Sequence, residues 1–310
     1  MPEGAPRLSL ALSSERVDGV TGPEFSGVGL VRGEYVFRRR REYVTVPGAR
    51  AALTSYLREV AAAFAPRPVW YRTSELEAAE VAVLDGGDDD SLVDPVPILG
   101  TRGIRRALRH PESFDLELGA FRDAADDFPN LGLLFPFVTE AAELDWALGR
   151  CRAVGVAAPV GVMAEIPAAV VCLDAFLALG AVRVLVGAND LWGLTMGVYR
   201  TSDAYRRDSD GFRRMLDLAR AATAARGVEL AMAGYLTPQH LGMAADAGLD
   251  ECAVHYSDLP ALLGPRYAAL PDLHVLHEVK TWTRAAIAAR ELRRPVPAVD
   301  GTSLGREVTP

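Results

Sequence analysis

Short apolar segments alternate with amphipathic segments along most of this chain. Apolar runs that are too short for buried helices predict β-strands. We expect eight strands, over residues 7–12, 27–30, 68–71, 131–138, 160–166, 182–187, 228–233 and 251–255. Apolar residues at helical spacing between these runs predict α-helices over residues 48–64, 140–154, 167–179, 210–226 and 238–247.

The alternation of strands and helices is typical of a parallel sheet, and eight parallel strands close naturally into a barrel. We therefore expect an α/β protein with the (β/α)8 TIM-barrel fold. A doubly wound open sheet is the alternative, but no G-x-G-x-x-G follows an early strand. Residues 1–293 are expected to form a single barrel domain, residues 85–95 an acidic loop, and residues 294–310 a flexible C-terminal tail.

The composition excludes several classes of protein. The chain has 310 residues, 50% of them hydrophobic, which is enough for a large core and rules out a mainly disordered protein. Its net charge of −8 disfavours nucleic-acid binding, and it lacks an apolar run long enough to span a membrane. Cys151, Cys172 and Cys252 form neither a disulfide framework nor a C-x-x-C metal site, so we expect a cytoplasmic protein.

Charged and polar residues close the predicted strands, where a barrel of this kind carries its chemistry. At or just after the strand ends lie Arg32, Glu34, Arg72, Glu165, Asn189 and Asp190. Two further arginines belong to the same rim: Arg102 precedes a helix start after the acidic loop, and Arg200 follows ten residues after Asp190. Carboxylates from neighbouring strands could share one Mg²⁺ or Mn²⁺ ion, and arginines could bind a carboxylate or phosphate. A single strand-end arginine is more often only solvated, and an isolated E-I-P or N-D more often a cap or turn. It is their recurrence on successive strands that favours a site.

Seven segments occur in a fixed order: GVGLVRGEYVF, WYRTSE, LGTRGIR, LLFPFV, VMAEIP, VGANDLWGLTMGVYR and LAMAGY. Over residues 7–262, this series resembles the C-terminal barrel of the phosphoenolpyruvate-utilising enzymes. That family includes phosphoenolpyruvate synthase, pyruvate phosphate dikinase and enzyme I of the sugar phosphotransferase system. Each motif alone is weak, whereas seven in order strongly favour the fold.

The resemblance implies a site that binds phosphoenolpyruvate or pyruvate together with Mg²⁺. The positions that match the family's substrate-binding residues are Arg32, Arg72, Arg102, Asn189 and Arg200. Glu165 and Asp190 match its metal ligands. The binding half of the site therefore looks intact.

The catalytic half departs from the family pattern. The family's seventh strand ends in C-G-E or C-G-Q, whose cysteine moves a proton at the pyruvyl methyl carbon. Here the segment is AMAGY, which places Ala233 at the cysteine position. Tyr235 and His255 are the candidate catalytic residues that could replace it, although a phenol of ordinary pKa is a poor base at neutral pH.

Three functions remain open. The first is a transferase of the kinase type that exchanges a phosphoryl group with a phosphohistidine on a separate, ATP-binding protein, because none of the five histidines lies in the family's phosphohistidine motif. The second is a lyase or carbon–carbon bond-forming enzyme that uses a Mg²⁺-stabilised pyruvate enolate. The third is an inactive barrel that senses a ligand or serves as a partner subunit. The family's barrels commonly form homodimers, so we expect one here.

Overall fold

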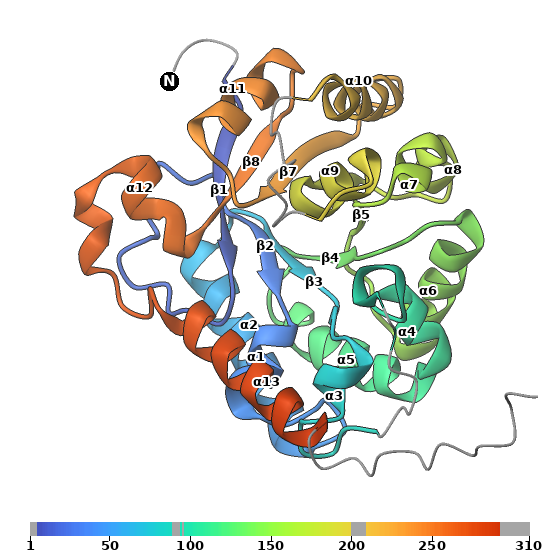
Figure 1. Ribbon diagram of the computed structural model, residues 1–310, viewed down its shortest axis with the longest axis vertical. Helices are drawn as coiled ribbons and strands as arrows, with labels where there is room; N and C mark the ends of the chain where they lie inside the picture. Colours follow the sequence, from blue (N-terminus) through green and yellow to red (C-terminus); the bar gives the residue numbers. More distant parts are fainter. Residues whose placement is uncertain (1–4, 89–93, 95, 200–208, 292–310) are drawn as a thin grey trace, which may run out of the picture.

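Eight parallel strands form a closed barrel in the order β1 to β8, each paired with its neighbours in the chain and β1 with β8 (Figure 1). The computed structural model describes residues 5–88, 94, 96–199 and 209–291. The strands are β1 (Arg7–Leu12), β2 (Val28–Arg32), β3 (Val69–Arg72), β4 (Leu131–Phe135), β5 (Val160–Ala164), β6 (Arg183–Gly187), β7 (Glu229–Gly234) and β8 (Glu251–His255). The predicted TIM-barrel fold is confirmed.

Helices surround the barrel and connect its strands (Figure 1). The α-helices are α1 (Glu34–Arg40), α2 (Pro47–Phe64), α3 (Ala78–Val81), α4 (Ile104–Arg109), α5 (Pro111–Ala125), α6 (Ala141–Val154), α7 (Pro167–Val171), α8 (Leu173–Ala178), α9 (Ala188–Met196), α10 (Asp210–Ala224), α11 (Pro238–Asp246), α12 (Leu259–Leu263) and α13 (Val275–Glu291). Short 3-10 helices are η1 (Pro97–Leu99), η2 (Tyr256–Asp258) and η3 (Pro265–Ala269). None of the described helices is long and apolar enough to cross a membrane.

Most predicted elements differ from the structure by one or two residues at their ends, and two differ by more. The strand expected over residues 131–138 ends at Phe135, because Pro136 has no amide proton for the sheet and Phe137 adopts a left-handed φ of 56°. The helix expected over residues 167–179 is two helices, α7 and α8, which meet at Cys172. The predicted tail, much of the acidic loop and Arg200 lie outside the described residues.

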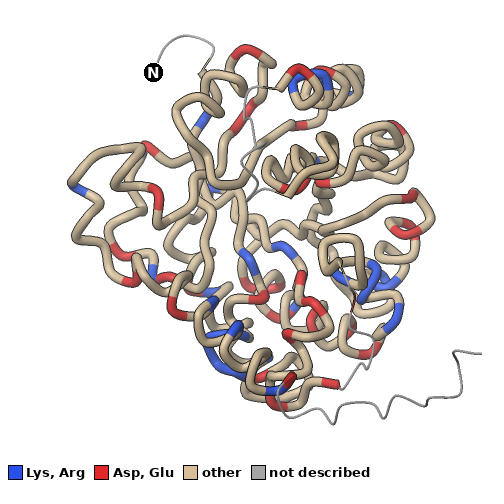
Figure 2. The backbone as a smooth tube through the Cα atoms, in the orientation of Figure 1, with Lys and Arg blue, Asp and Glu red and all other residues tan. Residues whose placement is uncertain are grey.

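The side chains that point into the barrel form layers, because successive residues of a strand face opposite sides. The middle layer is apolar and consists mainly of Ala11, Leu30, Trp70, Leu134, Met163, Leu185, Ala231 and Ala253. Two residues further along four of these strands, the inward positions are Arg32, Arg72, Glu165 and His255. The alternation therefore places the charged residues of the predicted site directly above an apolar layer. Figure 2 shows charged residues of both signs around the ends of β2 and β3.

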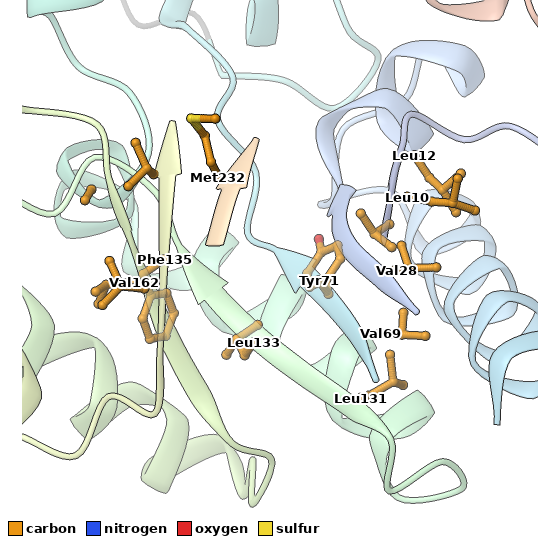
Figure 3. Packing of buried hydrophobic residues seen from close by; sticks show 14 of the residues in the cluster. Leu10, Leu12, Val28, Val69, Tyr71, Leu131, Leu133, Phe135, Val162 and Met232 are labelled. Atoms are coloured by element: carbon orange, nitrogen blue, oxygen red, sulfur yellow. The ribbon is translucent and has the colours of Figure 1, made fainter. Parts of the chain in front are cut away.

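The outward positions of the same strands pack against the helices. Figure 3 shows part of this cluster, with Tyr71 and Val69 of β3 beside Leu131 and Leu133 of β4. The ring of Tyr71 stacks on Phe121 of α5 at 5.6 Å between ring centroids. This packing, between strand and helix, forms the main core of the protein.

Below the apolar layer, the barrel interior contains a buried ion network. Arg183 is fully buried and forms ion pairs with Glu229 and Glu251. Burial tends to raise the pKa of Glu251, but the Arg183 guanidinium and hydrogen bonds from Ser9 and Ser26 outweigh it and lower that pKa. This network closes the barrel at the end opposite the predicted site.

Glu117 is a buried carboxyl group behind β3, and it should make stability depend on pH. Tyr71 donates a hydrogen bond to its Oε1 at 2.6 Å, and the amide of Ser74 donates another at 2.5 Å. Burial raises the pKa of Glu117 to about 7 despite these bonds. The folded protein therefore keeps a proton that the unfolded chain releases as the pH rises above about 4.5.

We expect the free energy of unfolding to fall by roughly 3 kcal/mol through Glu117 as the pH rises from about 4.5 to about 7. Glu117→Gln keeps the hydrogen-bond acceptor and should remove this contribution, so it should be the more stable protein at pH 8. Urea denaturation at pH 5 and pH 8 measures the difference. Glu112→Gln, an exposed change on the same helix, is the control. Parallel pH profiles for wild type and Glu117→Gln would contradict the assignment.

Candidate functional site

A cavity of about 340 Å³ lies at the C-terminal ends of the strands. Of the residues predicted for the site, it is lined by Arg32, Arg72, Arg102, Glu165, Asn189, Asp190 and Tyr235. His255 is buried beside Arg32 and does not line the cavity. The fold thus brings seven predicted residues, from strands far apart in the sequence, around one cavity of a size that suits a small ligand.

Three carboxylates meet on one side of this cavity. Glu165 follows β5, Asp190 lies in the first turn of α9, and Glu75 follows β3. Each offers one oxygen, and the three oxygens lie within 4.8 Å of one another. Glu165 is almost fully buried, and the amide of Phe137 donates a hydrogen bond to it at 3.2 Å.

The backbone of β6 leaves room for Glu165. A Cβ atom added at Gly187 would lie 2.6 Å from Cγ of Glu165, so a larger residue there would displace the carboxylate. Burial raises the pKa of Glu165 to about 7, Arg72 and Arg102 partly offset this effect, and the neighbouring Asp190 adds to it. Ionisation of Glu165 therefore costs free energy in the ligand-free site, and a bound cation would reduce that cost.

These oxygens fit a hard divalent cation. Carboxylate oxygens are the ligands that Mg²⁺ and Mn²⁺ prefer, and no His or Cys joins this group in the described part of the chain. Glu165 and Asp190 are the residues that would hold the ion. Glu75 is the weaker candidate because two arginines already share its charge.

The arginines opposite the carboxylates are held in place by acidic residues. Arg72 forms ion pairs with Glu34 and Glu75, and Arg102 with Glu75 and, at 3.3 Å, with Glu77. Glu75 thus lies between two of the predicted anion-binding residues. Glu75 was not among the predicted site residues, although it lies three residues after Arg72 in the segment WYRTSE.

Glu34 remains ionised at the base of the cavity. Burial tends to raise its pKa, but Arg72, Arg38 and Arg32 outweigh burial and lower it. Arg38 in turn binds Glu80 with two hydrogen bonds, at 2.6 and 2.7 Å. These pairs fix the orientation of the guanidinium groups before any ligand binds, which reduces the free energy that binding must supply.

Arg32 is oriented by neutral groups. Its Nε donates a hydrogen bond to Ser13 Oγ at 2.8 Å, and its Nη2 lies against Nε2 of His255. Burial, Arg32 and Lys280 together lower the pKa of His255 well below its ordinary value. His255 is therefore neutral: its Nε2 lies against Arg32, and its Nδ1 lies 2.7 Å from Ser257 Oγ and accepts a hydrogen bond from the amide of Ser257 at 3.2 Å. Its contacts position Arg32.

Ala233 and Tyr235 occupy the end of β7. Ala233 is buried at the wall of the cavity. Tyr235 is about one-third exposed, and its hydroxyl accepts a hydrogen bond from Nζ of Lys280 at 2.8 Å. Tyr235, two residues after the alanine, and its partner Lys280 both line the same cavity. Lys280 was not predicted, because its helix, α13, was missed.

Comparison with known proteins shows the family to which this chain is similar. The family model of the PEP-utilising enzyme, PEP-binding domain, matches residues 11–263. The phosphoenolpyruvate synthase of Pyrococcus furiosus is 33% identical over 57% of this chain and 23% of its own length. That of Deinococcus radiodurans is 27% identical over 82% of this chain and 38% of its own length. The chain therefore spans well under half the length of these relatives.

A solved structure agrees at the level of the fold. The citrate synthase SbnG aligns with 93% of this chain and 94% of its own, with a TM-score of 0.50 and 11% sequence identity. At that identity the likeness concerns the barrel alone. The family match covers most of the sequence, including every strand from β2 to β8. The chain belongs to the PEP-utilising enzymes and contains their PEP-binding domain.

Proposed function

We propose that this domain binds phosphoenolpyruvate or pyruvate with Mg²⁺ and transfers a phosphoryl group between them and a phosphohistidine on a separate protein. The observation that carries the proposal is the meeting of Glu165 and Asp190 with Arg72 and Arg102 around one cavity. Carboxylates for a cation and arginines for an anion are the two requirements of phosphoryl transfer.

The chain's own residues would bind and orient the substrate. When bound at Glu165 and Asp190, Mg²⁺ would neutralise negative charge on the enolate oxygen. Arg72 and Arg102 face this position with their guanidinium groups already aligned by Glu75, and Asn189 offers an amide at the same cavity wall. Because the cations are held before binding, most of the effect would come from positioning and charge neutralisation.

A second candidate function is favoured by Ala233. Alanine has no exchangeable proton. The methyl carbon of a pyruvate enolate bound near the end of β7 would therefore have no proton donor at this position. A lyase or a carbon–carbon bond-forming enzyme would direct the enolate to a carbonyl carbon instead. Mg²⁺-dependent product from pyruvate and an aldehyde or acyl acceptor would favour this function over phosphoryl transfer.

Calorimetric titration with oxalate, a planar dianion that resembles the pyruvate enolate, tests the shared first step. We expect oxalate to bind in the presence of Mg²⁺ and to bind at least about 10-fold more weakly when Mg²⁺ is removed by a chelator. Oxalate binding that is equal with and without Mg²⁺ would contradict a metal-assisted site. No binding under either condition would favour the inactive barrel, which acts as a sensor or partner subunit.

A further inference from the structure

Helix α13 forms one wall of the cavity although it lies beyond the segment that matches the family. The match ends at residue 263, whereas α13 covers Val275–Glu291. Its residues Lys280, Thr283, Arg284 and Ile287 line the cavity. In Figure 1 this helix, drawn in red, lies beside α1 and α3 near the ends of β2 and β3. Part of the binding cavity is therefore built from a segment outside the family pattern.

Packing fixes α13 in this position. Val275, Leu276 and Val279 form a buried cluster with Tyr35 of α1. The guanidinium of Arg32 lies 4.5 Å above the centre of the same Tyr35 ring, on the cavity side. Tyr35 thus contacts both the first turns of α13 and the side chain of Arg32. These contacts fix the position of the helix relative to the end of β2.

The cations of the cavity fall into two groups. Arg38, Arg72 and Arg102 each form an ion pair with a glutamate. Within the described part of the chain, Arg32, Lys280 and Arg284 form no ion pair with a carboxylate. Arg32 contacts Ser13 and His255, and Lys280 contacts Tyr235, all of them neutral groups.

The cations of the second group converge. Arg32 and Lys280 both lower the pKa of His255, because both lie close to its ring. The ring of Tyr235, which Lys280 contacts, is 6.1 Å from the ring of His255. Arg284 lies one helical turn beyond Lys280 and borders the same cavity. Like charges brought together in a partly buried place repel one another, and a bound anion would remove that repulsion.

We propose that Lys280 and Arg284 join Arg32 in a phosphoryl-binding subsite on the α13 side of the cavity. The proposal rests on the proposed function and extends it: the carboxylate and enolate end of the ligand would lie at Glu165 and Asp190, and the phosphoryl group would lie against α13. A phosphoryl group carries two negative charges and three terminal oxygens, so it suits three cations that form no ion pair with a carboxylate in the described part of the chain. A monocarboxylate would leave most of their charge uncompensated.

Ligands with and without a phosphoryl group test this subsite. Phosphoenolpyruvate and oxalate are titrated into the wild-type chain, Lys280→Met and Arg284→Met, all with Mg²⁺. We expect each substitution to weaken phosphoenolpyruvate binding about 10- to 100-fold, since each removes a charge-assisted contact. Oxalate binding should stay within about 2-fold of wild type because oxalate has no group to reach α13. Arg290→Met removes a cation of the same helix that does not line the cavity, and it should change neither affinity.

The outcomes separate the subsite from the function on which it rests. Equal losses of oxalate and phosphoenolpyruvate binding would overturn the subsite and show that α13 only supports the cavity as a whole. Unchanged phosphoenolpyruvate binding in both variants, with oxalate also bound, would overturn the subsite alone. A wild-type chain that binds neither ligand with Mg²⁺ would overturn the proposed function and the subsite together.

Discussion

Glu165→Gln should weaken Mg²⁺-dependent oxalate binding at least about 100-fold while leaving the fold intact. The substitution keeps the size of the side chain but removes the negative charge that would hold the cation. It also removes a carboxyl group whose burial raises its pKa to about 7. The ligand-free variant should therefore be as stable as wild type or more stable near pH 8, which sets the loss of binding apart from any loss of structure.

Calorimetry with oxalate and Mg²⁺, together with thermal unfolding of the same preparations, measures both effects. Asp190→Ala should lose metal-dependent binding in the same way, because it supplies the second oxygen of the site. Glu59→Gln, an exposed change on α2, serves as the control for charge alone. Retention of wild-type affinity by Glu165→Gln would show that the metal assignment is wrong.

Arg183→Met should lower the free energy of unfolding by roughly 3–5 kcal/mol. Arg183 is fully buried in the barrel, and without it Glu251 would be a buried carboxylate whose pKa burial raises. Glu229 would lose the same partner. The predicted loss is large because it comes from the charges left behind, whereas the methionine itself suits an apolar interior.

The double variant Arg183→Met, Glu251→Gln distinguishes this cause from simple loss of packing. Removing the second charge should recover a substantial part of the stability lost in Arg183→Met, since Ser9 can still donate a hydrogen bond to the amide oxygen. Urea denaturation at pH 7 of the wild type, both single variants and the double variant gives the coupling energy. If the stability losses of the two single variants add up to the loss of the double variant, the Arg183–Glu251 ion pair contributes little to the free energy of unfolding.

The barrel and most of its binding residues could be predicted from local pattern. Strand alternation depends on neighbouring residues only, so once a run such as that of β5 is recognised, its next inward position, Glu165, follows. The same holds for Arg32 and Arg72, which end β2 and β3. The site could be predicted from charged residues that recur at strand ends, because the C-terminal ends of parallel strands all lie on the same face of the barrel.

What was missed depends on contacts between distant parts of the chain. The apolar positions of α13 are spaced for a helix, but nothing nearby in the sequence indicates that Tyr35 is their partner or that Lys280 reaches Tyr235. Arg183 resembles an unremarkable charge at the start of a strand, and its partner Glu251 lies 68 residues away. Glu75 forms an ion pair with Arg102, which lies 27 residues further along the same connection between β3 and β4.

Closure of the barrel also limits how copies of this domain can associate. Since β1 pairs with β8, every strand has a hydrogen-bonded neighbour on both sides, and the sheet presents no edge. A second chain cannot extend the sheet by adding a strand to it. The expected homodimer would therefore have to use side chains of the surrounding helices and loops, and its specificity would depend on their shape and charge rather than on backbone pairing.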